Sequence, residues 1–398
     1  MEISGKLKSQ FTWLKNNYQF RYNSVSGMYE FRKLKKAKPI PGVGWVEYGD
    51  RHRNDILLLM ECADLSIPEA KLNIYIESTI TSSDYDPILE YFENLNKPES
   101  KVSIIDELAK TIKCDNPKFF QLAFKKFLVS TVACLLEPDA VNDTCLVFRA
   151  PQGEGKSRWM RKLLPKRFRA KLLKEGNIDP NHKDAKISLA QYWFIHLDEL
   201  ESLKGKNLSD VKSFITQQRI SERKSYGRYS SHFVRRASFI GSVNDPKFLT
   251  DITGNRRWLV FEVSAIDYQH NIDIDAIWSE AYQLYLDGYK HWFDKEEIKE
   301  LNDLNDNFRE MSLEEEMILK LYEFPTEEDK TGEWLSTSDI MIEITRLHGS
   351  VGQKININTL GRSLSHYCHL KKKSGVNKYY VRLKDEVAAE GGDVELPF

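Results

Sequence analysis

The sequence CLVFRAPQGEGKS, residues 145–157, decides what the central part of this chain can be. Its apolar start, Cys145–Phe148, is typical of a buried strand and leads directly into a turn with two glycines. The turn matches the phosphate-binding P-loop pattern G-x-x-x-x-G-K-[ST], except that Ala150 stands where the first glycine is usual. Because this pattern seldom follows an apolar strand by accident, we predict a nucleotide-binding loop rather than an ordinary glycine turn.

Each residue type in this loop suits contact with nucleotide phosphates. Gly153 and Gly155 would let backbone N–H groups close on phosphate oxygens, and Lys156 would reach the β- and γ-phosphates. Ser157 would ligate Mg²⁺. We therefore predict that the loop binds ATP with Mg²⁺ through Gln152, Gly153, Glu154, Gly155, Lys156 and Ser157.

A second apolar run, Tyr192–Leu197, ends in two carboxylates. Read alone, an Asp-Glu pair after a strand is more typical of a solvated helix start. Downstream of a P-loop, the same pair has the arrangement of a Walker B strand. There Asp198 would hold the Mg²⁺ shell, and Glu199 would orient or deprotonate water.

The next apolar run, Ala237–Val243, ends in a single amide, Asn244. An isolated Asn before Asp245 and Pro246 is typical of a turn. After two strands that end in phosphate and metal groups, Asn244 is better interpreted as a sensor that holds the attacking water against the γ-phosphate.

Paired arginines precede the fourth apolar run, which begins at Trp258. Planar guanidinium groups suit the charge that develops on a transferring phosphoryl group. Arg256 or Arg257 is therefore our candidate arginine finger. The alternative is a salt bridge that pins a β-hairpin.

The pattern around these motifs predicts an α/β fold, in which short buried strands alternate with helices from residue 141 to about residue 292. Two helices between Ser103 and Leu136 would lead into it. We divide the chain into an N-terminal mixed accessory domain (1–97), a helical lead-in (98–140), a P-loop ATPase domain (141–295) and a helical connection with a C-terminal domain (296–398). In the first of these we expect strands at Tyr18–Tyr22 and Gly27–Phe31 and a helix start at Asp84.

The C-terminal domain has the helix, helix, hairpin order of a winged helix, with helices near Ser338–Leu347 and Asn358–Leu370 and a strand at Tyr379–Leu383. Lys371, Lys372 and Lys373 would lie on its wing. His366, Cys368 and His369 do not share one helix face, which argues against a metal site.

Composition fits a globular chain, with 41% hydrophobic and 29% charged residues. The longest apolar runs are too short to span a bilayer, and five scattered cysteines without a CxxC pair suit a reduced, cytoplasmic protein without a membrane partner. The net charge of -1 conceals basic clusters, including eight Lys or Arg and no acid between Arg158 and Lys174. Overall neutrality therefore does not exclude nucleic acid.

The ordered motifs resemble the virulence-associated E proteins of phages and mobile elements, which are similar to superfamily 3 helicases of the AAA+ type. The resemblance runs from about Tyr85 to Phe293 and includes the P-loop, Leu197–Leu200, Arg223–Arg228, Gly241–Asn244 and Thr253–Arg257. It implies an oligomeric ring, often a hexamer, that hydrolyses ATP between subunits and moves along single-stranded or forked DNA.

The resemblance also places Arg223–Arg236 on a hairpin that points into the central channel. Its composition agrees, because Arg223, Lys224, Arg228, Arg235 and Arg236 would neutralise phosphate while Tyr226 and Tyr229 offer stacking faces. A solvated basic loop is the alternative. Some relatives carry a fused primase; residues 1–97 lack the separated acidic motif of such a site, so we expect any primase or other replication partner to be a separate protein.

The leading function is therefore an ATP-dependent DNA helicase or replication-initiation ATPase of a phage, plasmid or integrated element. Its main rival is an AAA+ switch or defence protein that assembles on nucleic acid with ATP but does not unwind it. A P-loop kinase would not account for Asn244, the paired arginines and the winged tail together.

Overall fold

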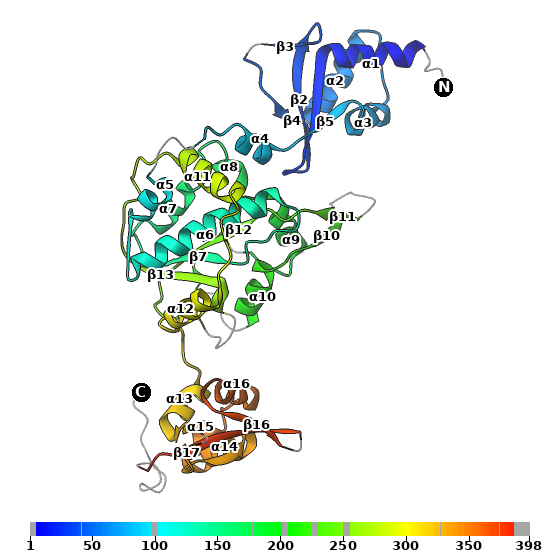
Figure 1. The fold of residues 1–398 in the computed structure, drawn as a ribbon. Coiled ribbons are helices and arrows are strands. Elements are labelled where there is room, and N and C mark those ends of the chain that lie inside the picture. Colours follow the sequence, from blue (N-terminus) through cyan, green and yellow to red (C-terminus); the bar gives the residue numbers. More distant parts are fainter. Residues whose placement is uncertain are drawn as a thin grey trace.

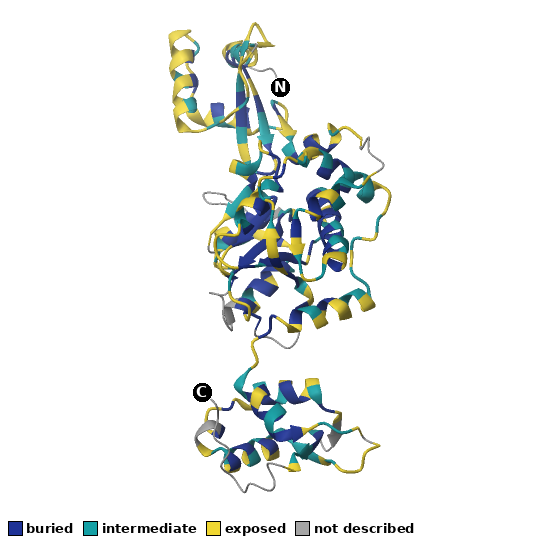
Figure 2. Ribbon diagram, turned by 90° about the vertical axis from the view of Figure 1, so that its left-hand side faces the viewer, coloured by how far each residue is buried: buried dark blue, intermediate teal, exposed yellow. Residues whose placement is uncertain are grey.

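The structure is a computed structural model of the 398-residue chain. It describes residues 5–40, 42–97, 102–176, 178–200, 206–223, 230–249, 255–326, 328–373 and 375–385. Three compact units follow one another along the chain (Figure 1), and buried residues gather on the central sheet and on the helix faces that cover it (Figure 2).

The N-terminal unit packs three helices against a small sheet. Its strands are ordered β3-β2-β1-β5, with β4 beside β2, and β1 runs antiparallel to β2 and parallel to β5. Aromatic and aliphatic side chains such as Phe20, Phe31 and Met60 form its core. The elements are α1 (Gly5–Asn17), β1 (Tyr18–Asn23), β2 (Met28–Lys35), β3 (Lys38–Pro39), β4 (Val46–Glu47), α2 (Asp50–Cys62), α3 (Glu69–Glu77) and β5 (Ser82–Tyr85).

The predicted strands of this unit are confirmed, but the predicted helix start at Asp84 is wrong. Asp84 lies in β5, and the next helix, α4 (Pro87–Glu93), is capped by the side chain of Asp86, which accepts hydrogen bonds from the backbone N–H groups of Ile88 and Leu89. Proline at the first helical position favours this later start.

The central unit is a mixed α/β domain. Among the described residues, its sheet has six strands in the order β6-β13-β7-β12-β9-β8. The four apolar runs expected to be strands are β7 (Cys145–Arg149), β9 (Phe194–Leu197), β12 (Ser238–Val243) and β13 (Trp258–Ile266), all mutually parallel where they pair. The edge strands β6 (Ile112–Cys114) and β8 (Leu173–Glu175) have three residues each.

Helices cover both faces of this sheet (Figure 1). The two predicted lead-in helices are present as α5 (Ile104–Ala109) and α6 (Pro117–Leu136). The others are α7 (Lys156–Lys162), α8 (Arg169–Leu172), α9 (Lys183–Gln191), α10 (Lys206–Ile215), α11 (Ile274–Leu286) and α12 (Lys295–Asp306). Helix α12, assigned from sequence to the C-terminal part, contacts β13 and adds Leu301 to the central core.

Helix α6 has 20 residues and is apolar over most of its length, although the apolar runs of the sequence looked too short to span a bilayer. In the described part of the chain it is the one helix that could cross a membrane by length and composition, but 78% of its apolar window is buried inside the fold. Phe120, Phe124 and Phe127 pack against β7, β13, β9 and α7. We therefore interpret α6 as the core helix of the central unit.

The C-terminal unit contains the predicted helices and hairpin. The helices are α14 (Thr337–Leu347) and α16 (Ile357–Tyr367), and the hairpin consists of β16 (Leu370–Lys373) and β17 (Val376–Leu383). Helix α16 ends at Tyr367, three residues before the expected Leu370, because the chain there enters β16. The unit is completed by α13 (Leu313–Leu321), β14 (Tyr322–Glu323), β15 (Glu333–Ser336) and α15 (Gly349–Gly352).

Candidate nucleotide site

Strand order brings the predicted phosphate and metal groups to one edge of the sheet. Strand β12 lies between β7 and β9 and is parallel to both, so the carboxyl ends of the three strands are neighbours. The P-loop follows β7, the Asp-Glu pair follows β9, and the predicted sensor follows β12. They line one cavity of about 290 Å³, together with Arg158 and Ser242: Gln152, Gly153, Glu154, Gly155, Lys156, Ser157, Asp198, Glu199 and Asn244.

Lys156 is the most buried charged group in this cavity, with 7% of its surface exposed. Its ammonium donates hydrogen bonds to the Asn244 side-chain oxygen at 2.8 Å and to the Pro151 carbonyl at 3.0 Å, and also contacts the Ala150 carbonyl. The bond between Lys156 and Asn244 joins the P-loop to the tip of β12.

The metal and water-activating candidates are exposed at the tip of β9. Asp198 accepts a hydrogen bond from the hydroxyl of Ser242 on β12, which orients the carboxylate. Glu199 has a backbone φ of 54°, in the left-handed region that residues other than glycine seldom occupy. Backbone strain of this kind is concentrated at functional sites.

The loop itself depends on glycine at two positions. Gly153 and Gly155 have φ values of 96° and 86°, which favour glycine. A Cβ at Gly155 would lie 2.3 Å from the Tyr268 ring, so this tyrosine packs directly against the loop backbone. The Tyr268 ring also lies 5.4 Å from the Arg158 guanidinium.

His196 lies inside the sheet on β9, the strand that Asp198 follows. It is 1% exposed and its ring Nδ1 lies 3.4 Å from a Glu175 carboxylate oxygen on β8. Burial lowers the pKa of His196 below its ordinary value, against the opposing effect of Asp198 and Glu175.

The paired arginines lie at the amino ends of the parallel strands, whereas the P-loop lies at their carboxyl ends. Arg256 and Arg257 belong to a 3-10 turn, η2 (Asn255–Arg257), directly before β13. Trp258 pairs with Cys145, at the start of β7, while the P-loop follows its end. Five strand residues span about 17 Å, so these arginines lie far from their own chain's Lys156.

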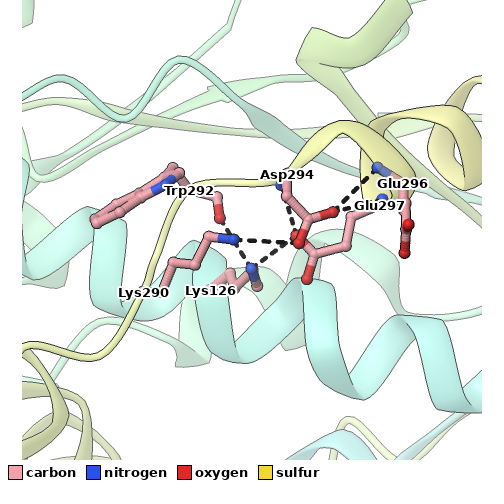
Figure 3. A network of polar contacts seen from close by, with 6 residues as sticks. All are labelled: Lys126, Lys290, Trp292, Asp294, Glu296 and Glu297. Carbon is pink, nitrogen blue, oxygen red and sulfur yellow. Dashed lines mark hydrogen bonds and ion pairs between the residues drawn. The ribbon is translucent and has the colours of Figure 1, made fainter.

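Figure 3 shows a polar network between α6 and the segment that leads into α12. Lys126 on α6 is 4% exposed at its side chain and donates to the Trp292 carbonyl at 2.8 Å and to Glu297 at 2.9 Å. Arg256 is exposed and shares a cavity of about 250 Å³ with Lys126 and Trp292. At the other end of α12, Asn305 donates to the carbonyls of Asn255 and Trp258.

The predicted basic hairpin is present before β12. Its strands are β10 (Ile220–Arg223) and β11 (Ser230–Phe233), which pair antiparallel, and the pair projects from the central unit in Figure 1. Lys224, Tyr226, Arg228 and Tyr229 lie outside the described residues. Arg223 is placed in β10, and its side chain is outside the description.

Two arginines expected to meet DNA phosphates have other roles, and that part of the prediction is wrong. Arg235 is fully buried, and its guanidinium donates to the carbonyls of Ile215, Gln217, Asn142 and Ala237. Arg236 forms an ion pair with Asp86 at 2.6 Å and is 14% exposed. An arginine before a strand looks the same in sequence whether it faces solvent or fills a gap in the core.

The remaining nucleic-acid candidates, Lys371 and Lys372, lie in β16 of the C-terminal hairpin, with side chains outside the described part. Two contacts beside the predicted motifs were not expected from the sequence. Tyr268 packs against the P-loop at Gly155, and the Lys212 ammonium lies 3.3 Å from the side-chain oxygen of Asn255, next to the paired arginines. Neither residue belongs to a motif, so no pattern indicated them.

The profile of the virulence-associated protein E-like domain matches residues 94–310, which is more than half of the chain. No curated protein matches the sequence. Among solved structures, the apo structure of the NrS-1 C-terminal region (305–718) aligns over 96% of this chain and 100% of its own, with 11% identity and a TM-score of 0.44. The A form apo structure of the same region aligns over 94% of this chain and 99% of its own, with 14% identity and a TM-score of 0.46.

Proposed function

Because the chain belongs to the virulence-associated protein E-like family, we propose that it is an ATP-dependent DNA helicase or replication-initiation ATPase of a phage, plasmid or integrated mobile element. In this proposal the central unit is a superfamily 3, AAA+ type P-loop core, and the C-terminal unit is a winged helix.

The observation that carries the proposal is the hydrogen bond from Lys156 to Asn244, in the cavity that Asp198 and Glu199 also line. It joins the two groups that a P-loop ATPase needs at the γ-phosphate. Because β12 lies between the P-loop strand β7 and the acidic strand β9, all four residues meet at the carboxyl ends of these strands.

The residues of the cavity fit ATP and Mg²⁺. Two glycines with positive φ leave the loop backbone open to phosphate oxygens, and the Lys156 ammonium would exchange carbonyl contacts for phosphate contacts. Ser157 and Asp198 would hold Mg²⁺, which would neutralise phosphate charge. Glu199 would accept the proton of the attacking water, and Asn244 would hold that water in line.

The position of Arg256 supports hydrolysis between subunits. It is exposed at the sheet edge opposite the P-loop, where a neighbouring copy of the chain could receive it. A homo-oligomeric ring, as in hexameric helicases of this type, would bring Arg256 of one subunit to the ATP of the next. The network around Lys126 and Glu297 would keep this edge rigid.

Two elements would contact DNA. The hairpin formed by β10 and β11 carries Arg223, Lys224, Tyr226 and Arg228 at and beyond the end of β10, and it would line the channel of the ring. The C-terminal unit would place Lys371 and Lys372 on the wing that follows α16. A primase would act as a separate partner.

The deciding experiment is strand displacement on a forked DNA duplex with ATP and Mg²⁺. We expect displacement by the intact chain and none by Lys156→Ala. ATP-dependent assembly on DNA without displacement would favour the rival function, a nucleic-acid switch or defence protein. If the intact chain hydrolyses no ATP, either with the forked duplex or without DNA, the ATPase assignment itself is overturned.

A further inference from the structure

A second and larger cavity, of about 520 Å³, lies between the N-terminal unit and the central unit. It shares no lining residue with the P-loop cavity. One wall comes from β1 and the segment before β4, and the other from α4, the region of α8 and the end of α9. Its volume lies in the range of small-ligand pockets.

The two walls are fixed to each other by contacts beside the cavity. Val25, in the turn after β1, is 2% exposed and belongs to the core cluster of the central unit. The next residue, Ser26, accepts a hydrogen bond of 3.1 Å at its carbonyl from the Gln191 side chain. The ion pair between Arg236 and Asp86 closes the same junction. The cavity is therefore built into the fold.

Part of the basic cluster noted in the sequence faces this cavity. Most of that cluster has partners elsewhere, such as Arg161 with Glu175 and Arg169 with a backbone carbonyl. Arg167 and Lys171 line the cavity, are exposed, and make no ion pair within the described residues. The Arg167 guanidinium lies 4.6 Å from the centre of the Tyr91 ring, which leaves its N–H edge available to an anion.

The other wall carries a platform of stacked planar groups. The Arg21 guanidinium lies 4.1 Å from the centre of the Trp45 ring and 3.3 Å from that of the Tyr85 ring. Arg21 is also paired with Glu30 at 2.5 Å, so its charge is already compensated. The second carboxylate at the cavity, Glu90, belongs to α4, on the same wall as Arg167, and accepts a hydrogen bond from the Tyr85 hydroxyl. Arg167 and Lys171 together exceed this one carboxylate, so the excess of positive charge lies on the Arg167 side.

We propose that this cavity binds one nucleotide unit, an aromatic base that carries a 5′-phosphate. The base would pack against the part of the Trp45 and Tyr85 rings that Arg21 and Arg32 leave uncovered, and the phosphate would contact Arg167 and Lys171. A free mononucleotide and a nucleotide within a single DNA strand share this chemistry. The proposal is independent of ATP binding at Lys156, because it depends on different residues.

Calorimetric titration of the full-length chain with thymidine 5′-monophosphate tests the site. The double variant Arg167→Gln, Lys171→Gln should raise the Kd at least about tenfold. The matched control is Lys166→Gln, an exposed neighbour that does not line the cavity and should leave the Kd unchanged. Binding should persist in Lys156→Ala, which separates this site from the P-loop.

Trp45→Ala supplies a second test that does not depend on charge. It should weaken thymidine monophosphate and leave deoxyribose 5-phosphate, which lacks a base, unaffected. Competition by a short oligothymidylate would identify the ligand as part of a DNA strand, and its absence would identify a free nucleotide. An unchanged Kd in the Arg167, Lys171 variant, or loss of binding in Lys156→Ala, would overturn the proposal.

Discussion

Lys156 and Asn244 are 88 positions apart in the sequence, and the Lys156 ammonium donates a 2.8 Å hydrogen bond to the Asn244 side-chain oxygen. The bond connects the loop after β7 to the tip of the adjacent strand β12. It forms because β12, rather than the acidic strand β9, is the neighbour of β7. The group proposed to contact the β- and γ-phosphates is therefore in direct contact with the group proposed to hold the attacking water.

Removal of the proposed water-activating carboxylate should separate binding from hydrolysis. Glu199→Gln should bind ATP with a Kd close to that of the unchanged chain, while kcat falls about 10²-fold or more, because the amide cannot accept the proton. Lys156→Ala should lose both. Steady-state hydrolysis and nucleotide binding measure the two quantities, and a normal kcat in Glu199→Gln would reassign the base.

Variants that each lack one of the two proposed catalytic groups should restore ATPase activity when they are mixed. Arg256→Ala and Lys156→Ala, each nearly inactive alone, should recover ATPase activity when mixed, because some interfaces then combine an intact Lys156 with an intact Arg256 from a neighbour. Arg257→Ala tested in the same way shows which arginine acts. If neither arginine variant is complemented and turnover per subunit is constant on dilution, the arginines act within their own chain.

Charge removal on the hairpin should affect DNA more than ATP. The triple variant Arg223→Ala, Lys224→Ala, Arg228→Ala should bind single-stranded DNA more weakly, with a salt slope flatter by about 2, and should keep its basal ATPase. The control removes three exposed lysines of α1, at positions 6, 8 and 15. Equal salt slopes in the hairpin variant and the unchanged chain would place the DNA track elsewhere.

Substitution of Arg235 should lower the stability of the fold rather than the affinity for DNA. Arg235→Ala should lower the free energy of unfolding by at least about 3 kcal/mol, because several buried carbonyl oxygens lose a charged donor. Arg219→Ala, which removes an exposed arginine nearby, should change it by less than about 0.5 kcal/mol. Denaturant unfolding measures both; equal stabilities would contradict the buried role.

His196 predicts a pH dependence of stability. Burial holds its pKa in the folded chain below the ordinary value of 6.5, so below that pH the unfolded chain binds more protons. The contribution of His196 is therefore fully present above about pH 6.5 and is lost as the pH falls. His196→Gln should flatten the decline in unfolding free energy between pH 7 and pH 5, whereas substitution of the exposed His369 should not.

The sequence predicted which residues meet in the candidate site better than it predicted their surroundings. Lys156, Asp198 and Asn244 each follow an apolar run, and such runs are visible because a central parallel strand is buried on both faces. The pairing order is set by tertiary packing, so nothing local revealed that β12 lies beside β7. The edge strand β8 is too short to leave a pattern, and the support given to Gly155 by Tyr268 comes from a loop without a motif.

Arg236 ties the segment that follows the N-terminal sheet to the start of β12. Arg236 holds Asp86 at one end of β12, and Asn244 follows the other end, while β7 and β9 pair with the strand along both sides. The nucleotide cavity and the junction with the N-terminal unit therefore lie at the two ends of one strand, which its neighbours hold along its length. A displacement of Asn244 would reach Asp86 through this single strand.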